Sequence, residues 1–147
     1  MSRILAIDYG KKRTGIAVSD PSQIIANGLT TVPTHTLFDF VKQYLEKEDV
    51  ERIVVGLPKK TNGEYSDNMS NITPFVNRLR KNFPDVPVDY YDERFTSVLA
   101  HQAILESGIG KKARQNKALV DQISATIILR DYMEWRRMMS TNNVDTP

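Results

Sequence analysis

The sequence contains no cysteine, and none of its apolar runs reaches the roughly 18 residues that a membrane-spanning helix needs. The missing cysteine excludes disulfide bonds and thiolate metal sites. A signal segment is not expected either, because an apolar strand pattern begins within a few residues of Met1. These absences predict a cytoplasmic protein with no membrane contact.

An excess of charge of either sign is also missing, since 20 lysine and arginine residues nearly balance 18 acids and leave a net charge of +2. Such a small charge does not by itself predict a nucleic-acid ligand. The basic residues nevertheless gather where strands or helices are expected to end. They are Lys11, Lys12, Arg13, Lys59, Lys60, Lys111, Lys112, Arg114 and Lys117. In an α/β fold they can form a basic edge around a cleft, although lysines in turns are ordinarily solvated surface residues.

The most informative stretch is the apolar run of residues 4–7, which ends in Asp8 and leads into a basic turn between Gly10 and Gly15. The run is typical of a buried strand. Its terminal acid has two interpretations. Asp8 either caps the turn, as short acids do, or points at a cation beneath a phosphate.

The rest of the chain alternates strands with helices, and we expect one domain over residues 1–139. Strands are predicted at 3–9, 14–19, 28–33, 52–56 and 86–91, and helices at 36–47, 68–82, 97–107 and 116–138. The first two strands form a hairpin, and helices separate the later ones. This pattern predicts an α/β fold with a mixed five-stranded sheet flanked by helices.

Two details of this organisation can be checked against a structure. Thr36 and Asp39 are expected to form a capping box at the start of the helix over 36–47. Residues 140–147 are polar and end in proline, so we expect a disordered tail there.

Two further acids fall where a ligand of such a sheet would bind. Glu93 follows the fifth predicted strand, and adjacent strand ends would bring it beside Asp8. Asp121 lies among apolar residues of the last helix, where a buried charge needs compensation. Three carboxylates without a nearby histidine or cysteine favour Mg²⁺ or Mn²⁺ over zinc. Each acid alone also has a structural explanation: a turn for Asp8, a neighbouring arginine for Glu93 and Lys117 for Asp121.

Four motifs resemble, in order, the signatures of the YqgF family, which is also described as RuvX or as Holliday junction resolvases. They are DYGKKRTGIAVSD at 8–20, VGLP at 55–58 with Gly63, DERFTS at 92–97, and Lys117 with Asp121. The resemblance implies a ribonuclease H-like fold and a bacterial cytoplasmic nuclease that matures the 5′ end of precursor 16S ribosomal RNA.

The resemblance also implies that Asp8, Glu93 and Asp121 bind divalent metal for phosphodiester hydrolysis. The basic residues would then contact phosphates, together with Arg94, which either pairs with Glu93 or meets a phosphate itself. The expected partner is precursor rRNA or, alternatively, branched DNA, and the expected state is a monomer or a weak homodimer. Related RuvC resolvases carry a further acid one helical turn after the last one, where this chain has Ser124, which argues against junction cleavage.

Two other functions fit parts of the sequence. Sugar kinases and actin-like ATPases place an Asp-x-Gly hairpin against nucleotide phosphates on a related core, but they pair two such domains. A non-catalytic RNA-binding module would explain the basic turns and Ser124. Asp8 and Gly10 alone do not separate a nuclease from an ATPase, and the prediction of a nuclease depends on Glu93 and Asp121.

Overall fold

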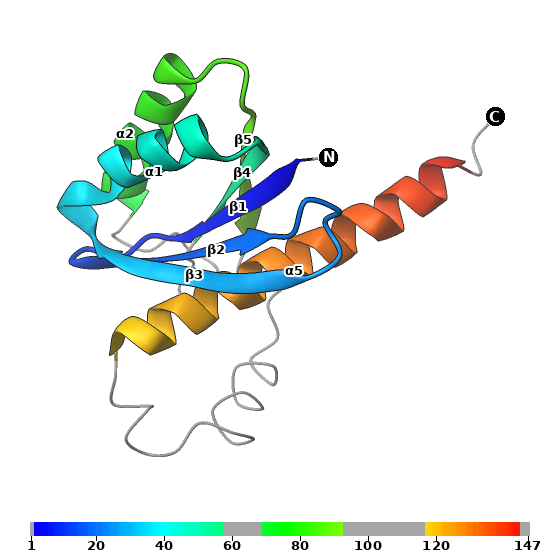
Figure 1. Ribbon diagram of the computed structural model, residues 1–147, viewed down its shortest axis with the longest axis horizontal. Helices are drawn as coiled ribbons and strands as arrows, with labels where there is room; N and C mark the ends of the chain where they lie inside the picture. Colours follow the sequence, from blue (N-terminus) through cyan, green and yellow to red (C-terminus); the bar gives the residue numbers. More distant parts are fainter. Residues whose placement is uncertain (1, 58–68, 93–116, 145–147) are drawn as a thin grey trace.

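A computed structural model of the chain describes residues 2–57, 69–92 and 117–144 (Figure 1). Its strands are β1 (Arg3–Asp8), β2 (Arg13–Ser19), β3 (Ala26–Pro33), β4 (Val50–Leu57) and β5 (Val88–Asp92). Its helices are the short 3-10 helix η1 (Thr34–Thr36), α1 (Leu37–Lys47), α2 (Met69–Asn82) and α5 (Lys117–Val144). The predicted helix over 97–107 lies outside the described residues. None of the described helices is both long and apolar enough to cross a membrane.

The strands form one five-stranded sheet in the order β3-β2-β1-β4-β5. β2 pairs antiparallel with both β1 and β3, whereas β4 pairs parallel with both β1 and β5. β1, β4 and β5 therefore all end at the same edge of the sheet. This arrangement confirms the predicted mixed α/β sheet.

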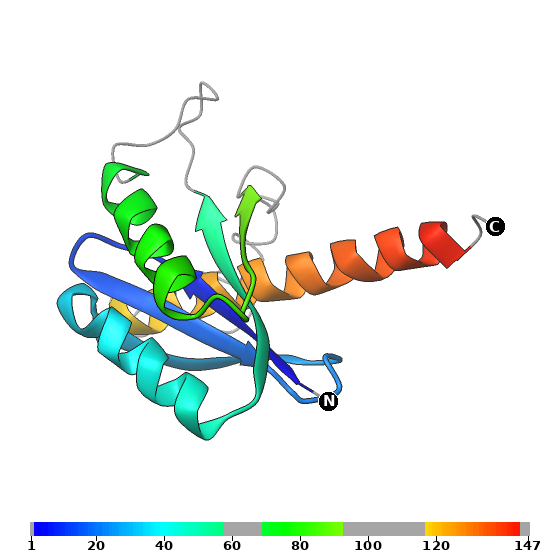
Figure 2. The same ribbon diagram turned by 90° about the horizontal axis from the view of Figure 1, so that it is seen from above.

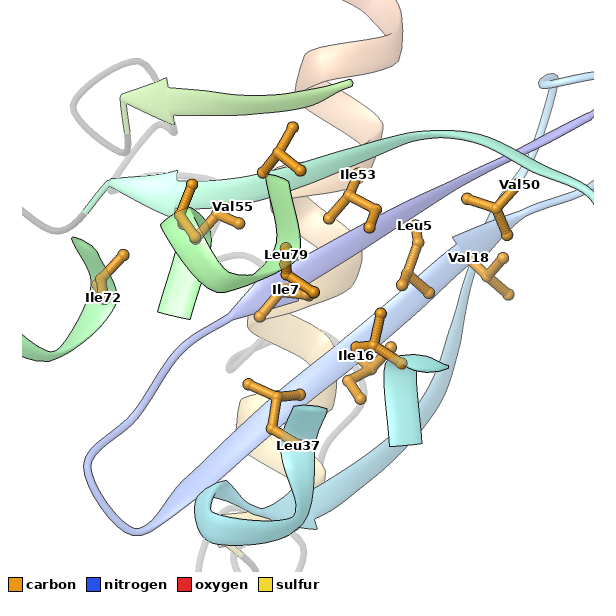
Figure 3. Packing of buried hydrophobic residues seen from close by; sticks show 13 residues of the cluster. Leu5, Ile7, Ile16, Val18, Leu37, Val50, Ile53, Val55, Ile72 and Leu79 are labelled. Atoms are coloured by element: carbon orange, nitrogen blue, oxygen red, sulfur yellow. The ribbon is translucent and has the colours of Figure 1, made fainter. Parts of the chain in front are cut away.

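Helices cover both faces of the sheet: α1 and α2 lie on one face, and α5 crosses the other (Figures 1 and 2). Side chains alternate between the faces along each strand. Leu5 and Ile7 of β1 accordingly join the core beneath α1 and α2 (Figure 3), whereas Ile4 and Ala6 pack against α5. Each strand residue in the middle of the sheet is thus assigned to one of two cores.

α1 and α5 differ from the sequence-based prediction at their ends. The hydroxyl of Thr36 donates to the carbonyl of Pro33 (2.8 Å) and makes no cap bond to α1, so the expected capping box with Asp39 is wrong. α5 continues to Val144 and does not end near Met138 as predicted. Leu37 and Val41 of α1 are buried against the sheet.

The turn between β1 and β2 is fixed by a glycine and by a threonine from beyond β3. A Cβ atom on Gly10 would lie only 2.2 Å from the carbonyl oxygen of Arg13, so this position requires glycine. Thr34 donates from its hydroxyl to the Gly10 carbonyl (2.7 Å) and from its amide to the Lys12 carbonyl (2.9 Å). The turn that follows Asp8 is therefore held in one shape by the rest of the sheet.

A polar tie joins β4, β5 and α5. The hydroxyl of Tyr132 on α5 donates to Oδ2 of Asp89 on β5 (2.7 Å), and the Arg52 guanidinium on β4 donates to the same oxygen. Burial, reinforced by the bond to Asp89, raises the pKa of Tyr132 to about 12. The tie fixes α5 to the strands near β5, the last strand in the order of the described sheet.

Candidate functional site

Asp8 ends β1, the middle strand of the sheet, at the edge where β4 and β5 also end. By strand alternation it lies on the face of Ile4 and Ala6, which is the face that α5 covers. Its side chain is partly buried. The structure therefore presents this carboxylate at the carboxyl edge of the sheet on the α5 side.

Glycines stand beside Asp8 on both neighbouring strands. Gly15 is its register partner on β2. On β4, Val55 pairs with Ile7, so Gly56 comes next to Asp8 in the register, and Gly56 in turn pairs with Tyr91 of β5. The register partners of Asp8 on both adjacent strands therefore carry no side chain.

The expected neighbourhood of Glu93 requires a correction. The first and fifth strands are not adjacent, because β4 lies between them, and their ends are two strand spacings, or about 10 Å, apart. They do end at the same edge, as parallel strands must. Glu93 itself follows the last residue of β5 and lies outside the described residues, so its pairing with Asp8 stays a prediction.

Asp121 is in α5, as predicted, one helical turn before Ala125, which is buried against the sheet. Its side chain lies outside the described part of the structure. The next residue, Gln122, packs against Gly28 of β3, where a Cβ atom would come within 2.7 Å of its Nε2. α5 thus passes over the sheet from β3, near Gln122, to β5, where Tyr132 binds Asp89.

Of the residues in the predicted basic edge, the structure describes Lys11, Lys12 and Arg13 together with Lys117. Lys11 and Lys12 are exposed in the turn directly after Asp8, and Arg13 opens β2 with a partly buried side chain. Lys117 is the first residue of α5. The other predicted contacts lie outside the described residues: Lys59, Lys60, Arg94, Lys111, Lys112 and Arg114.

The described residues contain no cluster of three or more histidine and acidic side chains that could hold a metal ion. Of the predicted ligand set, they supply the Asp8 carboxylate, a hard oxygen donor of the kind that Mg²⁺ and Mn²⁺ prefer. Its position between two glycines fits a cation that keeps water and substrate oxygens as further ligands. That Asp8 binds a metal ion stays a prediction.

The sequence did not predict that Gly15 and Gly56 lie on both sides of Asp8. No local signal reveals this, because it depends on which strands pair and in what register.

A mixed sheet of this strand order, with an acid at the end of its middle strand and a helix across one face, defines the ribonuclease H-like class of α/β proteins. The sequence model of the RuvX family, described as Holliday junction resolvase, matches residues 2–135. The chain belongs to this family, as its motifs predicted.

Relatives in three bacteria are similar along almost their whole length, and each is named "Putative pre-16S rRNA nuclease". The Phocaeicola vulgatus protein is 70% identical over 137 residues, which cover 93% of this chain and 99% of that protein. A Bacteroides fragilis protein is 68% identical over 138 residues (94% and 100%). The Porphyromonas gingivalis protein is 58% identical over 134 residues (91% and 97%). The chain is accordingly a nuclease, a hydrolase acting on nucleic acid.

Proposed function

We propose that the chain is a divalent-metal-dependent nuclease that acts in the 5′-end processing of precursor 16S rRNA in the cytoplasm. The observation that carries the proposal is the Asp8 carboxylate, held at the carboxyl edge of the sheet with glycines on both sides. The names of the relatives support the RNA substrate. We expect the protein to act as a monomer or a weak homodimer.

Asp8, Glu93 and Asp121 are the proposed metal ligands and catalytic residues. A bound Mg²⁺ or Mn²⁺ would supply activation of water and charge stabilisation for the leaving oxygen of a phosphodiester. Asp8 orients this site, because the turn after it is fixed by Gly10 and Thr34. We expect Lys11 and Lys12, which are exposed in the turn after Asp8, to contact phosphates of the substrate.

The test is a cleavage assay that offers precursor 16S RNA and a four-way DNA junction side by side. We expect Mg²⁺ or Mn²⁺ to support cleavage of the RNA. Ca²⁺ should support binding with little cleavage, because its looser coordination positions water poorly. Equal rates with Ca²⁺ and Mn²⁺ would contradict the proposed role of the metal.

Asp8→Asn is the decisive variant, since the amide keeps the shape of the side chain and removes its charge. We expect cleavage to fall more than about 100-fold, because a metal ligand is lost, while the thermal unfolding midpoint stays near that of the wild type. Asp39→Asn is the matched control, because Asp39 is an exposed acid of α1, across the sheet from Asp8. Full RNA processing by Asp8→Asn would favour an RNA-binding module.

Junction DNA is the second candidate substrate, favoured by the description of the matched family as Holliday junction resolvase. Ser124 of α5, where related resolvases carry an acid, argues against it. Cleavage of the junction at a rate above that of the RNA would reverse our choice between the two substrates.

A further inference from the structure

A pocket lies at the opposite end of β1 from Asp8, beside the loop between β2 and β3. It has a volume of about 190 Å³ and is lined by Ile4, Gln23, Met133, Arg136 and Arg137. Ile4 and Met133 are buried and form an apolar base, whereas Gln23 and the two arginines keep solvent access. No carboxylate belongs to the lining among the described residues. The pocket therefore combines an apolar base with two guanidinium groups.

The β2–β3 loop and α5, which lie side by side in Figure 1, hold these groups in place. Arg137 donates through Nη2 to the backbone carbonyls of Gln23 (3.4 Å) and Ile24 (3.1 Å). Gln23 adopts a left-handed backbone with φ of 58°, which is uncommon for a residue other than glycine. Its side-chain amide donates to the Ser2 carbonyl (2.8 Å). The loop is thus shaped so that two successive carbonyls meet Arg137.

Arg136 and the nearest acid of the loop, Asp20, also have defined contacts. Arg136 lies over the ring of Tyr132, with its Cζ 5.9 Å from the ring centre. Asp20, at the start of the loop, accepts hydrogen bonds from the amides of Ile24 (2.7 Å) and Ile25 (2.8 Å). The bond from the Ile25 amide is the main cause of the lowered pKa of Asp20. This carboxylate is engaged by its own loop, so it stabilises the loop's shape.

We propose that this pocket binds a phosphate group of the RNA backbone, as a second contact point remote from the catalytic edge. Guanidinium groups suit phosphate because their planar fork donates two parallel hydrogen bonds to its oxygens. The inference rests on the proposed function, which supplies RNA as the ligand. Neither arginine belongs to the basic groups that the sequence motifs predicted.

The position of the pocket sets a requirement on the substrate. Ile4 and Asp8 are four residues apart on the same face of β1, or about 13 Å. α5 packs against Ala6 between them. A strand of RNA must therefore pass around α5 to occupy both places. The structure assigns the enzyme a long or structured RNA, since a trinucleotide centred on the scissile bond fills the catalytic edge alone.

A binding measurement tests the pocket directly. Fluorescence anisotropy would follow a labelled RNA hairpin with a single-stranded arm over a series of KCl concentrations, without divalent metal so that no cleavage occurs. Arg136→Gln should weaken binding about threefold to tenfold near 0.1 M salt and lower the slope of log K against log salt by about 0.7. Lys42→Gln is the matched control, because Lys42 is exposed on α1, across the sheet from the pocket.

Arg137 provides a second variant, with its own control for folding. Arg137→Gln should weaken binding like Arg136→Gln, and Arg137→Lys should restore only part of it, because the charge is kept but the planar fork is lost. Thermal melting would confirm that the loop contacts to Gln23 and Ile24 are not needed for the fold as a whole. An unchanged salt slope in Arg136→Gln, or an equal loss in Lys42→Gln, overturns the proposal.

The same binding measurement tests two other ligands of the pocket, a free anion and an acidic protein segment. If inorganic phosphate binds the wild type but not Arg136→Gln, while RNA affinity is equal in both, the pocket is a free-anion site. If polyglutamate, as a stand-in for an acidic protein segment, loses affinity for Arg136→Gln and RNA does not, the surface recognises protein. Either result overturns the proposal.

Cleavage kinetics separate this inference from the proposed function. Arg136→Gln should lower kcat/KM for the long RNA and leave kcat/KM for a trinucleotide unchanged, because only the long RNA reaches the pocket. If the wild type cleaves neither RNA, the proposed function fails, whereas the metal-free binding measurement still decides whether the pocket holds RNA.

Discussion

The two faces of the sheet are built from different side chains. Beneath α1 and α2, the strands supply large aliphatic residues such as Leu5, Ile7 and Ile16. Beneath α5 they supply Ala6 and Ala17 together with Ile4 and Val54. Small residues allow α5 to approach the sheet closely, and this face also carries Asp8 and the tie through Tyr132. We infer that both faces stabilise the fold and that the α5 face also performs the chemistry.

The largest effects are expected from the same leucine-to-alanine substitution in the core on each face of the sheet. Leu79→Ala in α2 and Leu129→Ala in α5 both remove a fully buried leucine. Each should lower the free energy of unfolding by about 3 kcal/mol, since a cavity forms in a packed core. Urea denaturation measures this loss for both variants.

Activity should separate the two leucine variants. Activity is measured without urea, where both variants are folded. Leu79→Ala should then keep the wild-type kcat. Leu129→Ala should lose activity, because α5 shifts and carries Asp121 with it. Equal losses of kcat in the two variants would show that both faces contribute to catalysis.

The tie between α5 and the strands predicts a loss of stability at high pH. Between pH 10 and 12 the unfolded chain releases the Tyr132 proton, whereas the folded chain keeps it, because its pKa is raised to about 12. The folded state therefore binds more protons in this window, and stability falls as pH rises through it, by about 2 kcal/mol in total. The contribution is fully present below pH 10.

Tyr132→Phe isolates this effect from the lysines, which titrate in the same range. The variant should be about 1 kcal/mol less stable at neutral pH, because the Asp89 carboxylate loses a donor while it keeps Arg52. Urea midpoints measured at neutral pH and at about pH 11 should then converge between variant and wild type. A constant difference across this range would mean that the hydroxyl does not titrate as described.

The smallest effect is expected where α5 passes over β3. A Cβ atom at Gly28 would lie 2.7 Å from Nε2 and 2.8 Å from Cγ of Gln122, so Gly28→Ala should cost about 1 kcal/mol by overpacking. The double variant Gly28→Ala with Gln122→Ala should regain that stability, as chemical denaturation can measure. If it does not, the approach of α5 to β3 is limited by something other than this contact.

Local sequence patterns predicted most helices and strands, but they did not predict which distant segments pair with one another. The hairpin of β1 and β2 follows from a short turn, and the buried face of α1 from its spacing of apolar residues. The insertion of β4 between β1 and β5 depends on how the connecting helices pack, so the sequence analysis placed the first and fifth strands together wrongly.

The same reason explains what was missed at the functional surfaces. The contact of Arg137 with Ile24 joins residues 113 positions apart, and no motif marks it. Asp8 was identified because its strand and turn are adjacent in the chain. The glycines beside it were not recognised as a pair, since Gly15 and Gly56 meet it only through the register of the sheet.

α5 is synthesised after all the strands that it covers. Domains form from the N-terminus onward as a chain leaves the ribosome, and β1 emerges long before the helix that covers Ile4 and Ala6. Until α5 docks, that side of the sheet stays open, and the proposed site lacks Asp121. Under the proposed function, a nascent chain therefore gains the capacity to cut RNA only after α5 has left the ribosome and docked on the sheet.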